Sequence, residues 1–448
     1  MTWWMWAAIA APGLLVLVGV CLRDPLRVTL PIFGAVIPFG GLLSVGDSPF
    51  GSASSIIGLL LAAGLLLQFT RNRPTASVVS PTAPVWVLFV GVACATMLWT
   101  VNRAETVNGV LVLGSLVLVY VLVALSPVDA VAVRRTEDGL LVGGVLVVCY
   151  GLYQLLYLGG FPDDAGGSDA VEGGRFGNDM LGPGIEAVSL LLPFVLALSR
   201  ASESSGRRTR AGRSVYLAVA ALIFWGVLMT GSRTGTLAAG LVVLALACSG
   251  PLHARAKLFG VFAVGLAVAL AVWVYQPAGV ASRSFESATS SSGRLEIWSV
   301  GLAACPEYCW AGSGWGTFST VYAQTQASVP SAKVLVGSTG TYQAHNVWML
   351  AVVELGILGF ILLTWALVRG LAESWQLPRA VRGAPFSALV GLIFAVFFLS
   401  SLEFKCFWMV FILIALYRNH VSSIGAGDPG PRVPRHSAAS SSGQEGPG

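Results

Sequence analysis

His345 occupies the most suggestive position for chemistry in this sequence, at the point where a long polar stretch enters an apolar segment. The chain contains only four histidines, and the polar stretch spans residues 276–344. A neutral imidazole can take a proton from a hydroxyl group, so it can act as a general base. The positive end of a helix that starts here would disfavour the imidazolium and keep the ring neutral. A histidine that only makes structural hydrogen bonds is the simpler alternative.

Two arginines, Arg233 and Arg294, could supply anion binding beside this histidine. Arg233 opens an apolar segment, and Arg294 lies in the polar stretch that leads to His345. A guanidinium stays charged and presents a planar fork of donors that matches phosphate oxygens. The polar stretch also contains Arg283 and Lys333, either of which could bind phosphate in place of Arg294. The alternative for Arg233 is an arginine that extends from a span end toward lipid headgroups.

The elements that position these residues must be membrane-spanning helices. Hydrophobic residues make up 55% of the 448 residues and charged residues 10%, and the mean hydropathy is +0.78. A helix needs about 20 apolar residues to cross roughly 30 Å of hydrocarbon, and strand-like alternation is absent. We therefore expect an all-α fold, a polytopic transmembrane helical bundle of about 12–13 spans. The expected spans lie near 3–21, 26–45, 52–70, 83–100, 107–126, 139–158, 183–199, 214–230, 233–249, 257–275, 345–368, 386–400 and 404–418.

Basic residues gather in every second loop between these spans, and the positive-inside rule makes those loops cytoplasmic. The clusters are Arg23 and Arg27, Arg71 and Arg73, Arg134 and Arg135, residues 200–213, Arg255 and Lys257, and residues 369–382. The alternate loops then lie outside, together with the N-terminus. Arg233, Arg294 and His345 fall on that outer side. The net charge of +5 thus reflects topology and gives no support for binding nucleic acid.

The sequence predicts one integral membrane domain over residues 1–418, with the extracytoplasmic loop 276–344 inside it. Residues 419–448 are rich in glycine, proline and serine, which predicts a disordered cytoplasmic tail. If 386–418 formed one broken span, the count would be about 12 and one terminus would change sides.

Other polar groups are open to more than one interpretation. Cys305 and Cys309 lie four residues apart in the outer loop, where a local disulfide could form. Glu354 follows His345 by nine positions on the opposite helix face, which suggests a packing or gating carboxylate. Glu403 and Lys405 interrupt an apolar stretch, either as an ion pair within the membrane or as a short hairpin turn. The cysteines and histidines show no metal-ligand spacing.

A series of short motifs in the second half of the chain adds a family resemblance. The motifs are Ser232-Arg233-Thr234-Gly235, Gly293-Arg294 with Trp298, Pro306, the run from Gly312 to Phe318, His345-Asn346, and Glu354-Leu355-Gly356 with Gly359. In order and spacing they resemble the signature region of the O-antigen ligase and polymerase superfamily. The resemblance is best from about 216 to 371, and the segment Arg175-Phe176-Gly177-Asn178 is a weaker match before it.

This resemblance implies an enzyme that transfers a glycan at the outer face of the cytoplasmic membrane. The donor would be a polyprenyl diphosphate-linked glycan, and the acceptor a hydroxyl on a lipid, a glycan or a protein. Arg233 and Arg294 would hold the diphosphate, Arg175 and Asn346 would contact substrate, and His345 would activate the acceptor. The family likeness implies no metal, cofactor or nucleotide sugar. Its ligases and polymerases share these motifs, so the sequence does not separate the two activities.

The main alternative is a transporter or flippase for a lipid-linked or anionic envelope precursor. Outward-facing arginines would suit such a protein, but transporters generally contain internal repeats with charged residues near the midplane. The two halves of this sequence show no such repeat. A scaffold within an envelope-synthesis complex is the third interpretation.

Overall fold

The computed structural model shows a bundle of apolar helices. It describes residues 16–43, 50–71, 79–158, 176, 182–202, 210–250, 258–263, 265–266, 294–330, 343–400 and 402–427. Within these ranges, seven helices are long and apolar enough to cross a membrane, and four shorter apolar helices accompany them. The protein is therefore an all-α, polytopic helical membrane protein, as predicted. Most of the expected spans 3–21 and 257–275 lies outside the described residues.

The first half of the bundle contains helices that approach each other through glycines. These elements are η1 (Pro25–Thr29), α2 (Leu30–Val36), η2 (Ile37–Leu43), α3 (Ala53–Arg71), α4 (Ala83–Ala95), η3 (Thr96–Leu98), α5 (Arg103–Leu125) and α6 (Ala130–Tyr157). A Cβ on Gly143 of α6 would lie 2.3 Å from the carbonyl oxygen of Ala35. Glycine at this position therefore lets α2 pack directly on the backbone of α6.

The second half of the bundle carries the residues of interest. Its helices are α7 (Gly182–Ser189), α8 (Leu191–Ser202), α9 (Arg210–Met229), α10 (Arg233–Ser249), α17 (Val347–Gln376), α18 (Gly383–Val396) and α19 (Lys405–Gly427). Helices α10 and α18 run antiparallel, since Gly383 lies against Leu246 and Gly391 against Val242. Helix α19 continues beyond its predicted end at 418. The reason is that Asn419 is buried and donates to the carbonyl oxygens of Ala124 and Ser126, both at 2.9 Å.

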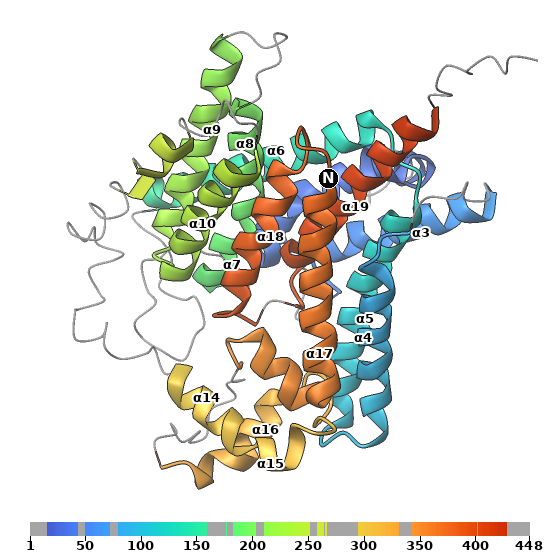
Figure 1. Cartoon of the computed structure of the whole chain (residues 1–448), viewed down its shortest axis with the longest axis vertical. Helices are drawn as coiled ribbons and strands as arrows, with labels where there is room; N and C mark the ends of the chain where they lie inside the picture. The colour runs from blue at the N-terminus through green and yellow to red at the C-terminus, as the bar shows by residue number, and fades with distance from the viewer. Residues whose placement is uncertain are drawn as a thin grey trace, which may run out of the picture.

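A separate layer of short helices covers one end of the bundle (Figure 1, bottom). We call residues 294–330 the loop layer; it contains α14 (Arg294–Ala303), α15 (Cys305–Tyr308), α16 (Phe318–Thr325) and η5 (Gln326–Ser328). Its own small core joins buried residues of α14 and α16, such as Val300 and Tyr322, to Ala344 and Val353. Cys305 and Cys309 form a disulfide within this layer.

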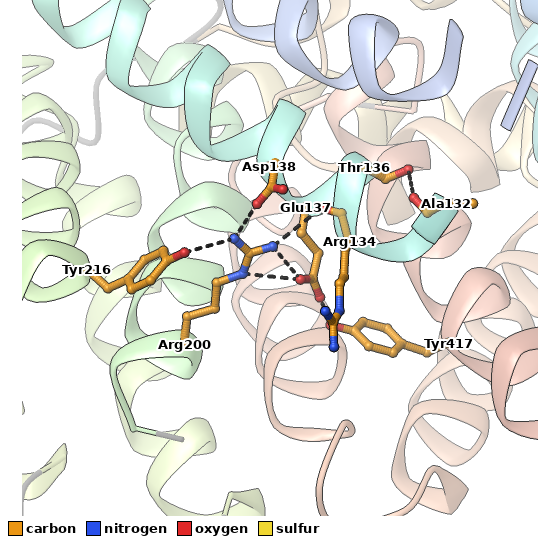
Figure 2. A network of polar contacts seen from close by, with 8 residues as sticks. All are labelled: Ala132, Arg134, Thr136, Glu137, Asp138, Arg200, Tyr216 and Tyr417. Atoms are coloured by element: carbon orange, nitrogen blue, oxygen red, sulfur yellow. Dashed lines mark hydrogen bonds and ion pairs between the residues drawn. The ribbon is translucent and has the colours of Figure 1, made fainter. Parts of the chain in front are cut away.

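The opposite end of the bundle gathers basic residues, as the alternating loops predicted. There Arg27 pairs with Asp129, and Arg418 with Glu373 at 3.0 Å. Figure 2 shows a further network, in which buried Arg200 pairs with Glu137 and Asp138 of α6. Tyr216 of α9 accepts from Arg200, and Tyr417 of α19 donates to Glu137. The network thus joins four helices at the end remote from the loop layer.

Candidate functional site

Helix α14 holds Arg294 beside the segment that leads into α17. The indole Nε1 of Trp298, one turn after Arg294, donates to the carbonyl oxygen of Ala344 at 2.9 Å. Ile297 and Val300 are buried in the core of the loop layer, on the other side of the helix from exposed Leu295. The half-buried Arg294 therefore begins a helix that is held in place both by this hydrogen bond and by its buried apolar side chains.

His345 lies between this anchored segment and α17, outside the membrane-spanning helix. Its φ of 47° places it in the left-handed region, which costs most residues about 1–2 kcal/mol. Such strained backbone is concentrated at functional sites, where the surrounding structure maintains it. Asn346 follows in an extended conformation and caps α17, because its Oδ1 accepts from the backbone N–H of Met349 at 2.9 Å. Anchors at Ala344 and Asn346 thus fix the strained histidine from both sides.

The electrostatic surroundings of His345 favour the neutral ring. Burial of the imidazole, and then the positive charge of Arg294, lower the pKa of His345 from 6.5 to about 4. The sequence-based argument attributed a neutral ring to the helix end, whereas burial and the arginine are the causes in the structure. At neutral pH the ring is therefore uncharged and able to accept a proton. Arg294 lies near enough for its charge to act on the ring, in agreement with the hydrogen bond from Trp298 of the same helix to Ala344.

Arg233 is exposed at the first position of α10, at the same end of the bundle. Ser232 caps this helix, because its Oγ accepts from the backbone N–H of Gly235 at 3.1 Å. Helix α18 packs on α10, and its C-terminal end, which lies beside the start of α10, continues into Phe397. The Phe397 ring contacts Trp298 and Trp348, with ring centroids 6.0 Å and 5.8 Å apart. These aromatic contacts connect the end of α10 that carries Arg233 to the elements that carry Arg294 and His345.

Glu354 plays a part that the sequence did not reveal. It is buried, and its carboxylate accepts two backbone hydrogen bonds, from Gly316 and Phe318, each at 2.8 Å. Its position in an apolar helix suggested packing or gating, but the carboxylate instead anchors the glycine-rich segment of the loop layer. The only sequence signal was the spacing of glycines in that segment, which does not identify their partner.

Helix α17 is broken at Gly356, and the break allows backbone carbonyl groups of this helix to accept hydrogen bonds from the loop layer. Gly356 has φ of 72°, and a Cβ there would lie 2.4 Å from the carbonyl oxygen of Trp310. Around the break, the N–H of Ser313 donates to Val353 O at 2.9 Å, and that of Gly314 donates to Glu354 O at 3.0 Å. The loop layer is therefore hydrogen-bonded to the same helix that begins beside His345.

Trp315 is buried against α4 and α5, where its ring contacts Phe89 at 5.6 Å. The N–H of Val101, just before α5, donates to Ser313 O at 2.9 Å. These contacts tie the loop layer to the first half of the bundle as well, so its position does not depend on α17 alone.

Several predicted site residues cannot be placed beside this group. Arg175, Arg283 and Lys333 lie outside the described residues. Asn346 lies next to His345, and its Oδ1 already accepts the hydrogen bond that caps α17. Among the described residues, no group of three or more His, Cys, Asp or Glu side chains is arranged to hold a metal ion.

Comparison with known families agrees with the motifs. Residues 218–364 match the family model described as O-antigen ligase, which confirms the expected resemblance. This segment includes Arg233, Arg294 and His345, together with the loop layer and the first part of α17. Among curated proteins, none matches the chain significantly.

Proposed function

We propose that this multi-pass membrane protein, whose residues 218–364 match the O-antigen ligase family, transfers a glycan from a polyprenyl diphosphate to a hydroxyl acceptor. The observation that carries the proposal is that the helix beginning at Arg294 is hydrogen-bonded, through Trp298, to Ala344, the residue before the half-buried His345. An arginine fit for phosphate and an imidazole fit for proton transfer thus occupy neighbouring positions. The acceptor is a hydroxyl on a lipid, a glycan or a protein.

The reaction requires one proton transfer and one displacement. His345 takes the proton from the acceptor hydroxyl, and the freed oxygen attacks the anomeric carbon of the donor sugar. The bond between that carbon and the diphosphate oxygen breaks, and its electron pair leaves with the polyprenyl diphosphate. Arg233 and Arg294 stabilise the negative charge that develops on the departing diphosphate. The product is a new glycosidic bond and a polyprenyl diphosphate.

We assign the site to the outer face of the cytoplasmic membrane. The end of the bundle opposite the site carries the arginine clusters, which the positive-inside rule assigns to the cytoplasm. The loop layer contains the Cys305–Cys309 disulfide, a bond that persists in oxidising compartments. Both observations support an orientation with the loop layer outside. A lipid-linked donor would then meet its acceptor at the outer face of the membrane.

The test is glycan transfer by the purified protein in lipid nanodiscs, with an extracted lipid diphosphate-linked glycan and separate lipid, glycan and protein acceptors. We expect His345→Ala to lower kcat at least about 100-fold, because a positioned general base contributes about 10²–10⁴-fold. The matched control is His420→Ala, which removes a histidine from α19 at the opposite end. Arg103→Gln provides the control for Arg233→Gln and Arg294→Gln, because Arg103 is an exposed arginine at the same end of the bundle.

Transfer that persists in His345→Ala would eliminate the general-base role. A wild-type protein that yields no product with any acceptor would contradict the proposed function itself. If instead it moved the lipid-linked glycan across the bilayer, the transporter interpretation would replace it.

A further inference from the structure

A polar pocket lies at the start of α19. Its volume is about 50 Å³, and it is bordered by η2, α3, α7 and the turn before α19. Polar and aromatic side chains share its lining: Ser54, Ser189, Glu403, Phe404 and Lys405. Nothing in the mechanism proposed above uses these residues.

The charged groups of this pocket do not neutralise each other. Lys405 donates to Ser52 Oγ at 3.3 Å, and Ser52 in turn contacts the Oγ of Ser54 at 3.1 Å. Glu403 is exposed and, within the described residues, takes part in no hydrogen bond or ion pair. The sequence allowed either an ion pair or a hairpin turn for Glu403 and Lys405, and the structure shows the turn. A carboxylate and an ammonium thus border one pocket without being paired.

The pocket and the candidate site share one connecting segment. Residues 397–404 run from α18 to α19, and at the start of this segment Phe397 contacts Trp298 and Trp348. At the end of the segment, Glu403 and Phe404 line the pocket. A ligand that extends from His345 along this segment could reach the pocket.

We infer that this pocket binds a hydroxyl-bearing sugar ring of one of the two substrates, a conclusion that rests on the proposed function. A carboxylate accepts hydrogen bonds from sugar hydroxyls, while an ammonium and serine hydroxyls donate to sugar oxygens. Phe404 and Ile185 offer an apolar wall to the C–H face of the ring. A neutral polyol can donate a hydrogen bond to Glu403 and accept one from Lys405 at the same time. An anion would be repelled by Glu403 and a cation by Lys405. The sugar belongs either to the donor glycan or to the acceptor.

The experiment measures the KM of donor and acceptor separately for Glu403→Gln and Lys405→Met. We expect the KM of one substrate to rise about tenfold, because each variant removes a charged hydrogen-bonding partner of the sugar. The substrate whose KM changes identifies the source of the sugar. The matched control is Glu307→Gln, which neutralises an exposed carboxylate on α15 away from the pocket. Folded variants that leave both KM values within twofold of wild type would overturn the inference.

A binding measurement separates this inference from the proposed reaction. The probe is the radiolabelled oligosaccharide released from the lipid-linked glycan by mild acid, added to wild-type protein and to Glu403→Gln in nanodiscs. We expect the wild type to bind it about ten times more tightly, if the sugar comes from the donor. The acceptor glycan is tested in the same way. If neither probe distinguishes the two proteins, the pocket is not a sugar site, whatever the outcome of the transfer assay.

Discussion

At the scale of single residues, the local backbone and a neighbouring charge determine what His345 can do. The sequence indicated the histidine, because it stands alone at the entrance to a span. It could not indicate the left-handed backbone or the burial of the ring, because both depend on the docking of α14 through Trp298. Nor could it identify which of the basic residues Arg283, Arg294 and Lys333 lies nearby. The structure places the helix that begins at Arg294 against Ala344, the residue before His345, and the other two lie outside the described residues.

The charge of Arg294 should be measurable in the titration of His345. A neighbouring cation disfavours the imidazolium, so Arg294→Gln should raise the pKa of His345 from about 4 toward 6.5. During acidification the His345 ring of the variant would therefore become protonated, and stop accepting protons, at a higher pH than the ring of the wild type. The measurement is the rate at which diethyl pyrocarbonate modifies His345 as a function of pH, followed by mass spectrometry, because only the neutral ring reacts.

The control for this titration is Arg103→Gln, which removes an exposed charge from α5 and should leave the midpoint unchanged. A midpoint that stays fixed in Arg294→Gln would show that burial alone determines the pKa, and the proximity of the two side chains would lose its support.

At the scale of elements, the glycine-rich segment and the broken helix α17 form one unit. The sequence predicted a span from 345 to 368, and α17 (Val347–Gln376) covers nearly all of it. The sequence did not predict that Glu354 would join this helix to the glycine-rich segment, because a carboxylate in an apolar helix usually marks a pore or a gate. Backbone N–H groups of Gly316 and Phe318 satisfy this carboxylate instead. Helix α14 is amphipathic, with Leu295 and Leu302 exposed on one face.

Glu354→Gln should loosen the loop layer from α17. A glutamine amide has one acceptor oxygen, so its NH₂ group would face a backbone N–H and leave that donor without a partner. We expect a loss of about 1–3 kcal/mol in stability, seen as a lower melting temperature and faster proteolysis within residues 311–318. Glu307→Gln, which changes an exposed glutamate of the same layer, should melt as the wild type does. Equal melting of both variants would contradict the anchoring role.

At the scale of the whole molecule, hydropathy and charge predicted most of the architecture. Apolar segments placed the helices, and the alternation of arginine clusters separated the two ends of the bundle. Precise boundaries were harder to predict, because they depend on tertiary contacts. Helix α19, for example, runs to Gly427 because Asn419 finds buried carbonyl partners on α5. The network around Arg200 was equally unpredictable, since Glu137, which pairs with Arg200, and Tyr417, which donates to Glu137, lie far from Arg200 in sequence.

The orientation of the bundle can be tested by labelling single cysteines in a background without the free ones. Ser328→Cys lies exposed in the loop layer, and Ala380→Cys lies exposed in the turn between α17 and α18. A membrane-impermeant maleimide should label the first in intact cells and the second only after permeabilisation. The reverse pattern would place the candidate site in the cytoplasm and contradict an outward-facing glycan transfer.

The break at Gly356 also bears on how the chain is assembled during synthesis. The carbonyl groups of Val353 and Glu354 take their partners from Ser313 and Gly314, which leave the ribosome earlier. The loop layer therefore remains without its anchor until the first part of α17 has been made. A nascent chain stopped before Val353 would already contain Arg294 and His345 but would lack the carbonyl groups that bind Ser313 and Gly314. The reactive end of the protein thus forms late in translation, after most of its helices have already entered the bilayer.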